Sequence, residues 1–348
     1  MRSRKSKNKM GKILLVLTSI LSLYFVPWDI LGMQLSPQSK DLQEEMDKAQ
    51  KYGFDGAILY VHQKGVTKQY ASGWNNRESQ QPANPNSLFK IASISKLYIA
   101  AAVAKLVAKD SLSLSKNLKE YLPERAVRIE NAEAITLKNL VEHRSGIPDY
   151  TRHPDYPWNE PFKINHDTYS LVYDQAADFK PNAKYKYSNT NYLLIGEILD
   201  TTLGYSHHEY IKKEIIEKLH LKNTYNLLSE VDLESVMSGY FVGYDKDIKE
   251  NDYIQPGGSM IATASDVGIF LQALNAGTLL SNKEQEIYRS IYKFEHTGLL
   301  PGYQSIARYI KELDATIVLF VNTSGGNSWS KMNILFKKIT KVLKKNIA

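Results

Sequence analysis

The feature that most constrains this chain is a Ser-x-x-Lys tetrapeptide at the start of an apolar, alanine-rich run. Residues 97–107 contain neither glycine nor proline, which predicts a buried helix. Ser93 and Lys96 then lie at the helix N-terminus on one face, so that the hydroxyl and the amine can share a cleft. Only this context distinguishes the tetrapeptide from others of the same spacing. Those begin at Ser6, Ser87, Ser113, Ser290 and Ser328.

A serine and a lysine in this arrangement suit nucleophilic acyl transfer. Lys96 can accept a proton only while its amine is neutral, and burial, the positive end of a helix or a nearby cation would lower its pKa. The free N–H of Ser93 at the helix start would also donate to an oxyanion. Ser93 is therefore the candidate nucleophile, and Lys96 is a candidate base.

Two rarer motifs follow further along the chain. Among 23 tyrosines only Tyr187 is followed two residues later by asparagine, Asn189. A His-Thr-Gly motif occupies residues 296–298, where the glycine permits close approach of the backbone to a ligand. We expect Tyr187 to share a hydrogen-bonded cluster with Lys96, Asn189 to be a ligand donor, and residues 296–298 to form the far wall of the cleft.

In this order the three motifs resemble the active site of the penicillin-recognising serine hydrolases. Tyrosine in the second motif resembles the class C β-lactamase branch, which includes D-stereospecific peptidases and carboxylesterases. Two more segments are similar to that family: residues 140–150 to its His-x-Ser-Gly segment, and residues 256–266 to its Gly-Gly-x-x-x-Thr-x-x-Asp segment. The similarity spans residues 36–345.

The resemblance implies a serine hydrolase that forms an acyl-enzyme on Ser93 and acts on an ester or a D-amino-acid peptide, with no metal or organic cofactor. It places the oxyanion donors at the N–H groups of Ser93 and Leu299. Whether Lys96 or Tyr187 is the working base stays open. The implied catalytic residues are Ser93, Lys96 and Tyr187. The implied substrate-binding residues are Asn189, His296, Thr297, Gly298 and Leu299.

Two alternatives accompany this interpretation. One is a β-lactamase or a D,D-carboxypeptidase, but these penicillin-targeted enzymes commonly carry lysine where this chain has His296. A histidine of ordinary pKa, ~6.5, is mostly neutral at pH 7 and offers less to an anionic substrate. The other is a binding or sensor protein that has lost turnover, against which the intact Ser93, Lys96 and Tyr187 argue.

The net charge of +7 would suggest nucleic-acid binding if it were spread over the whole chain. Six cations precede the first acidic residue, which leaves +1 for the rest of the chain. They are Arg2, Arg4, Lys5, Lys7, Lys9 and Lys12. A nucleic-acid partner is therefore not expected, and the lysines of the C-terminal helix are interpreted as a solvated face.

The basic residues run into an apolar stretch, residues 13–26, in the pattern of a bacterial export signal. We expect residues 1–32 to be a signal peptide or a membrane anchor and residues 36–345 to be the catalytic domain, periplasmic or held at the outer face of the cytoplasmic membrane as a monomer. Cleavage near Gly32 and retention as an anchor both stay open, because an Ala-x-Ala site is missing. The lack of cysteine shows only that no disulfide is needed.

The expected fold class is α+β, of the β-lactamase/transpeptidase-like type. A hairpin turning at Lys64-Gly65 and two paired strands over residues 303–310 and 315–322 would share one antiparallel sheet. Residues 39–52 and 328–345 are predicted helices, and a mostly helical lobe of loops and short helices fills the middle of the chain to about residue 285. The site would lie in the seam between sheet and lobe.

Several other residues that could suggest a functional site also have a structural interpretation. The pair His207 and His208 lacks the spacing of a zinc motif, so these histidines are expected at the surface. His143 is expected to have a hydrogen-bonded packing role. Aromatic residues of the 150–162 segment are equally consistent with a substrate-binding lip and with a loop that has its own small core. They are Tyr150, Tyr156, Trp158 and Phe162.

Overall fold

The structure is a computed structural model that describes residues 17–18, 21–22 and 24–345. The basic residues of the expected export signal lie outside the described residues, as does most of the apolar stretch before residue 24. Within the described part, no helix combines the length and the apolar character that crossing a membrane requires.

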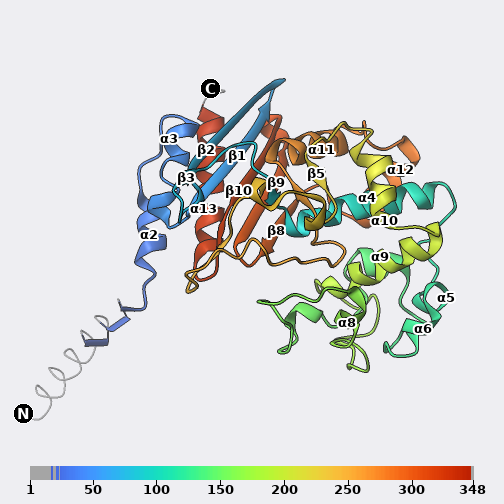
Figure 1. Cartoon of the computed structure of the whole chain (residues 1–348). Coiled ribbons are helices and arrows are strands. Elements are labelled where there is room, and N and C mark those ends of the chain that lie inside the picture. The colour runs from blue at the N-terminus through green and yellow to red at the C-terminus, as the bar shows by residue number, and fades with distance from the viewer. Residues whose placement is uncertain (1–16, 19–20, 23, 346–348) are drawn as a thin grey trace, which may run out of the picture.

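One antiparallel sheet joins the two ends of the chain, as predicted (Figure 1). Its strand order is β3-β2-β1-β10-β9-β8. The hairpin turns at Lys64-Gly65, and β10 lies between β1 and β9. The strands are β1 (Gly56–Gln63), β2 (Val66–Asn76), β3 (Gln81–Pro82), β8 (His296–Leu300), β9 (Tyr303–Ile310) and β10 (Ala315–Val321).

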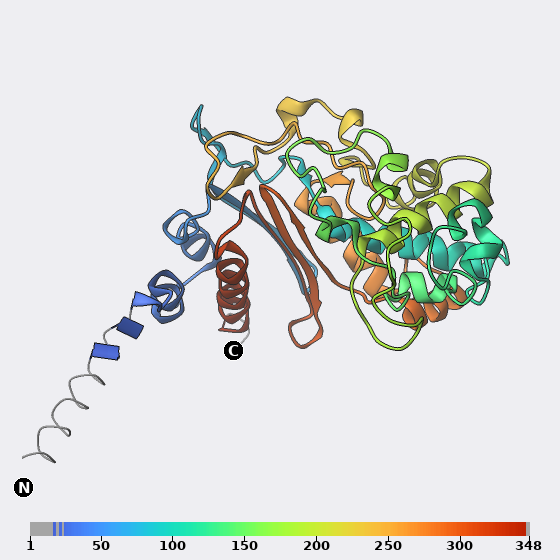
Figure 2. The ribbon, with the colours of Figure 1, turned by 90° about the horizontal axis from the view of Figure 1, so that it is seen from below.

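The two faces of the sheet are covered by different helices, because alternate residues of each strand point to opposite sides (Figure 2). Leu59 belongs to the core formed with α13 (Ser328–Lys345), beside α2 (Trp28–Leu35) and α3 (Leu42–Met46). Its neighbour Tyr60 belongs to the core on the other face, formed with α4 (Ser95–Ala108) and α11 (Ala264–Ala276). The predicted helix over residues 328–345 is confirmed.

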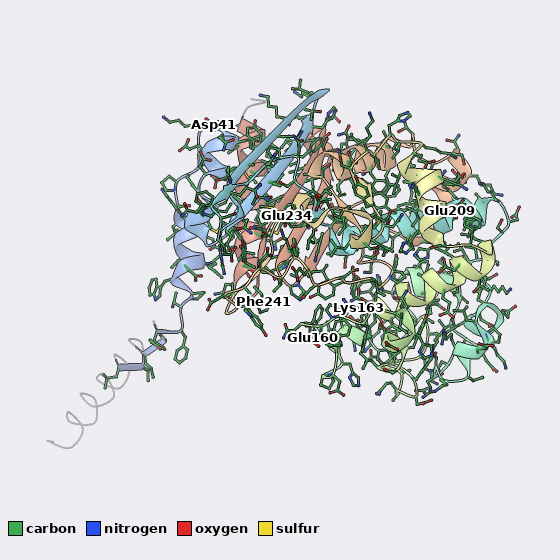
Figure 3. All side chains as sticks on the ribbon, in the orientation of Figure 1. Asp41, Glu160, Lys163, Glu209, Glu234 and Phe241 are labelled. Atoms are coloured by element: carbon green, nitrogen blue, oxygen red, sulfur yellow. The ribbon has the colours of Figure 1, made fainter. Side chains whose placement is uncertain are left out.

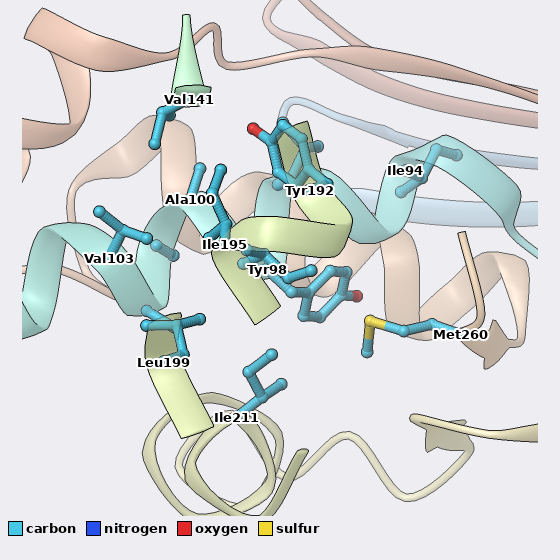
Figure 4. Close-up of a cluster of buried hydrophobic side chains, with 14 of the residues drawn as sticks. Ile94, Tyr98, Ala100, Val103, Val141, Tyr192, Ile195, Leu199, Ile211 and Met260 are labelled. Carbon is cyan, nitrogen blue, oxygen red and sulfur yellow. The ribbon is translucent and has the colours of Figure 1, made fainter. Parts of the chain in front are cut away.

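The helical lobe packs around α4, whose residues from Ser95 to Leu106 are all buried. Figure 4 shows Tyr98 and Val103 of α4 beside Ile195 and Leu199 of α9 (Asn189–Leu203). The other helices are α5 (Leu118–Tyr121), α6 (Pro123–Ala126), α7 (Leu137–Val141), α8 (Asn165–Tyr169), α10 (His207–Ile211) and α12 (Asn282–Ile291). The short strands are β4 (Phe89–Lys90), β5 (Thr224–Tyr225), β6 (Tyr240–Phe241), β7 (Ile261–Ala262) and β11 (Thr323–Ser324).

Two predictions about helices are wrong. Residues 39–52 are not one helix: Asp41 caps the short α3, and a separate 3-10 turn ends at Gly53 in a left-handed conformation. The middle of the chain also contains α9 and α11, which are longer than the short helices predicted there. Each contains a glycine that lowers helix propensity but allows close packing. A Cβ at Gly196 would lie 2.6 Å from Pro256, and one at Gly268 would lie 2.2 Å from the Tyr60 ring.

The surface assignment of the histidine pair is also wrong for one member. His207 is buried, and its Nδ1 lies 2.8 Å from an Asp200 carboxylate oxygen. The pair forms no metal site with its neighbours: within the described residues, no group of three or more His, Asp or Glu side chains is placed to hold a metal ion.

Candidate active site

Ser93 lies in a 3-10 turn, residues 92–94, that leads directly into α4. Ala92 before it has φ of 53°, a left-handed conformation that non-glycine residues rarely adopt. Strand β8 runs beside this turn because Gly298 has no side chain: a Cβ there would lie 2.4 Å from the Ile91 carbonyl oxygen and 2.2 Å from Ser305 Oγ. The His-Thr-Gly segment therefore borders the serine, as predicted.

The three expected catalytic side chains meet at the Ser93 hydroxyl. The Tyr187 hydroxyl donates to Ser93 Oγ at 2.8 Å, and Lys96 Nζ donates to the same oxygen at 3.3 Å. Tyr187 ends a loop just before α9, whereas Lys96 is on the first turn of α4. Their meeting therefore depends on the packing of α9 against α4.

The Lys96 amine is fully buried and has two closer partners. It donates to the Gly257 carbonyl oxygen at 2.7 Å and to Asn189 Oδ1 at 2.9 Å. Gly257 has φ of 83°, and a Cβ there would lie 3.0 Å from Lys96 Cγ and 2.9 Å from Tyr192 Cβ. Only glycine fits this approach, so Gly257 contributes to the site through its backbone.

The pKa of Lys96 falls from 10.5 to about 7. Burial is the main cause and the charge of Lys293 adds to it, whereas the Asp149 carboxylate acts in the opposite direction. Burial has the opposite effect on the phenol: it raises the pKa of Tyr187 well above its ordinary value, despite the hydrogen bond to Ser93 that lowers it. Near pH 7 the cluster therefore holds a lysine that is partly neutral amine and a tyrosine that keeps its proton.

Asn189 bridges Lys96 to an acidic residue that sequence reasoning missed. Its amide NH₂ donates to both carboxylate oxygens of Asp149, at 3.3 and 3.2 Å, and to Thr151 Oγ1 at 3.3 Å. Since its carbonyl oxygen already accepts from Lys96, the amide holds the cluster together as well as facing the cleft. Asp149 belongs to the 140–150 segment similar to the family, but no spacing rule marked it.

His296 is buried and neutral, in agreement with the neutral charge state predicted for it. Its Nε2 lies 2.9 Å from the Tyr292 hydroxyl, and burial, followed by the charges of Lys293 and Lys96, lowers its pKa well below 6.5.

His143 is also buried. Its ring stacks on Tyr187 with centroids 4.3 Å apart, and burial lowers its pKa to about 3. This packing matches the structural role expected for it.

A cleft of about 1170 Å³ opens over the cluster. Ser93, Tyr187, Asn189, His296, Thr297 and Leu299 all line it. The aromatic segment packs on itself and also lines the cleft: Tyr156 packs edge-on against Trp158 with ring centroids 4.7 Å apart, and both residues are part of the cleft wall. Lys293 also lines the cleft wall, although the Ser-x-x-Lys tetrapeptide that it ends was not predicted to be functional.

The architecture matches solved structures of known proteins. D-amino acid amidase from Ochrobactrum anthropi SV3, complexed with L-phenylalanine amide, is 22% identical with a TM-score of 0.77, covering 88% of this chain and 98% of that one. A class C beta lactamase is 17% identical with a TM-score of 0.68, covering 86% of this chain and 97% of that one. At these identities the likeness defines the fold, which is β-lactamase/transpeptidase-like.

The sequence narrows this class to a family. A family model described as Beta-lactamase matches residues 40–290, and the chain belongs to the beta-lactamase family. Penicillin-binding protein 4* of Bacillus subtilis (strain 168) is 24% identical over 257 residues, or 68% of this chain. The chain spans 56% of the length of that relative. The resemblance inferred from the motifs is thus confirmed.

The lowered pKa of Lys96 predicts a pH-dependent stability. Between about pH 7 and pH 9 the unfolded chain, where the pKa is near 10.5, holds more protons than the folded state, so the free energy of unfolding rises with pH. The slope from one such group is at most ~1.4 kcal/mol per pH unit. Lys96→Met should lose this contribution, whereas Lys283→Met, at an exposed position, should keep the wild-type slope.

Urea denaturation at several pH values in this window measures the slopes. Lys90, whose pKa burial also lowers to about 7, remains in both variants and contributes equally to each. A Lys96→Met protein with the full wild-type slope would contradict the assignment of the lowered pKa to Lys96.

Proposed function

We propose that the chain is a serine hydrolase that forms an acyl-enzyme on Ser93 and acts on an ester or a D-amino-acid peptide or amide. The observation that carries this proposal is the convergence of Tyr187 and the buried Lys96 amine on Ser93 Oγ, at 2.8 and 3.3 Å. Membership of the beta-lactamase family and the fold shared with D-amino acid amidase support the same reaction class.

The pKa values favour Lys96 as the base and Tyr187 as the proton donor. In the acylation step, neutral Lys96 Nζ takes the Ser93 hydroxyl proton while Oγ bonds to the substrate carbonyl carbon, and the carbonyl π electrons move to oxygen. The N–H groups of Ser93 and Leu299 would hold this oxyanion, each typically worth ~3 kcal/mol. As the tetrahedral intermediate collapses, the leaving group departs with the Tyr187 proton, which Lys96 replaces.

Deacylation uses the same two groups in the same roles, with water in place of the Ser93 hydroxyl and the Ser93 oxygen as the leaving group. Water attacks the acyl carbon, its proton passes to Lys96, and the Ser93 oxygen leaves with a proton returned through Tyr187. The carboxylic acid is released and the free serine is restored. No step needs a metal or an organic cofactor.

The walls of the cleft indicate the substrate class. Tyr150, Tyr156 and Trp158 suit an apolar or aromatic acyl group. Neutral His296 leaves the motif without the cation that would attract a carboxylate, which favours neutral esters and amides. A β-lactamase or D,D-carboxypeptidase is the second candidate, because Lys293 provides a cation elsewhere on the wall.

The proposed location is outside the cytoplasmic membrane. The cations and apolar residues of the 1–32 segment support export, with the catalytic domain on the outer face of the membrane. A protein found in the cytosol with an intact N-terminus and no membrane fraction would overturn this proposal.

Replacement of the nucleophile gives the first functional test. Ser93→Ala should abolish covalent labelling by a fluorophosphonate and hydrolysis of a nitrophenyl ester, because it removes the oxygen on which Lys96 and Tyr187 converge. Ser290→Ala, which removes an exposed serine from another Ser-x-x-Lys match, should label normally. Intact-mass analysis with peptide mapping reads the result, and a label on any other serine would sink the assignment.

The neutral His296 predicts a substrate preference. The wild type should hydrolyse a neutral nitrophenyl ester with higher kcat/KM than a chromogenic cephalosporin, which carries a carboxylate. His296→Lys should shift the ratio toward the cephalosporin by about tenfold, since one new charge contact in a cleft is worth roughly 1–2 kcal/mol. Lys293→Met should shift it in the opposite direction.

Steady-state kinetics on the three proteins with both substrates measure these ratios. A wild type that clears the cephalosporin at ~10⁶ M⁻¹s⁻¹ or faster while ignoring the ester would replace the esterase or peptidase assignment by β-lactamase.

A further inference from the structure

The far end of the cleft lies at one edge of the domain, where two segments of the chain meet. The turn between β11 and α13 contributes Gly325 and Gly326 to the lining, and the first turn of α13 contributes Trp329. On the other segment, Phe241 ends β6 and Tyr244 follows in the loop after it. Strands β6 and β11 pair with each other, which joins the two segments. Figure 3 shows Phe241 below the sheet and Glu160 on the neighbouring part of the helical lobe, and both residues line the cleft.

The N-terminal helix α2 is attached to the same end of α13. Lys331 Nζ lies 2.8 Å from an Asp29 carboxylate oxygen, only two residues after Trp329 in the cleft wall. Met33 of α2 is buried in the core that contains Met332 and Leu335. Helix α2 is therefore part of the folded body and packs beside α13 (Figure 1). The chain before α2 joins the body next to the end of α13 that lines the cleft.

This edge exposes large apolar side chains. At the rim, Val242 is 54% exposed, Tyr244 47% and Leu299 55%. In the segment leading to α2, Tyr24 is 84% exposed and Phe25 76%. The Val242 N–H bonds to the Ser324 carbonyl and the Gly302 N–H to Ser324 Oγ, so the segment that holds Val242 and Tyr244 lies beside the β8–β9 turn that follows Leu299. Single apolar residues are normal on a protein surface, but a group that includes an aromatic side chain is typical of residues at a membrane interface.

We propose that this edge of the domain, with Val242, Tyr244 and Leu299, rests on a lipid bilayer, so that the cleft opens at the membrane surface. The sequence before the body supplies the argument for lipid as the occupant. It holds the apolar run of residues 13–26 and six cations that complement anionic headgroups, and it joins the body at this edge. The proposal rests on the export proposed above, with the N-terminal segment retained.

The chain has no cysteine, so single labels can be placed without background. Val242→Cys and Val66→Cys are matched variants, because the two valines are 54% and 57% exposed. Val66 begins β2 at the hairpin turn, and β1 and β2 pair from there to Gly56. The Gly56 N–H bonds to Asn322, immediately before β11, so Val66 lies at the far end of the sheet from the proposed contact.

Full-length variants carrying a nitrobenzoxadiazole label would be reconstituted into vesicles of phosphatidylglycerol and phosphatidylcholine. The label at position 242 should show blue-shifted emission and quenching by nitroxide lipids, whereas the label at position 66 should emit as it does without vesicles. Equal, weak quenching at both positions in vesicle-bound protein would overturn the proposed orientation. Failure of the full chain to bind vesicles would overturn both the orientation and the anchor.

Fluorophosphonate labelling of Ser93 in the same samples separates this proposal from the proposed function, and circular dichroism reports the folding of each variant. Serine labelling without quenching at position 242 would leave the hydrolase assignment standing and refute the membrane contact. Quenching at position 242 in a folded protein whose Ser93 does not react would support the membrane contact and refute the hydrolase assignment.

Discussion

Burial of the Lys96 amine is the constraint on which the rest of the site depends. The amine is enclosed by the Gly257 carbonyl, Asn189 and Ser93, and its pKa falls from 10.5 to about 7. This shift corresponds to roughly 5 kcal/mol against the ammonium form. A solvated lysine would stay protonated and could not accept a proton near pH 7. The same enclosure keeps the Tyr187 phenol protonated, so that the two groups can act in opposite directions on one hydroxyl.

The packing of sheet and helices creates this enclosure. Helix α4 is buried along almost its whole length, which fixes the direction of Lys96, and α9 delivers Tyr187 and Asn189 from the opposite side. Two glycines complete the arrangement because they permit backbone contact: Gly257 against Lys96, and Gly298 against the turn that holds Ser93. Stability and chemistry are thus linked, since the core that buries α4 also lowers the pKa of its lysine.

Much of this arrangement could be predicted from sequence, and the remainder has identifiable physical reasons. The hairpin at Lys64-Gly65 and the final helix have strongly periodic hydrophobic patterns. The motifs correctly predicted that Ser93, Lys96 and Tyr187 lie in one cluster. Asp149 and the Gly257 carbonyl were missed because a buried carboxylate and a backbone oxygen follow no spacing rule. The lengths of helices α9 and α11 were underestimated, because each has an internal glycine that lowers helix propensity and that tertiary packing overrides.

The pH dependence of Ser93 acylation tests the central claim most directly. The second-order rate of fluorophosphonate labelling should rise with pH around a midpoint near 7, where Lys96 loses its proton. Asp149→Asn should lower this midpoint, because the carboxylate stabilises the ammonium, and Lys293→Met should raise it, because a neighbouring cation is removed. A midpoint near 10, or one that moves in the same direction in both variants, would contradict the account.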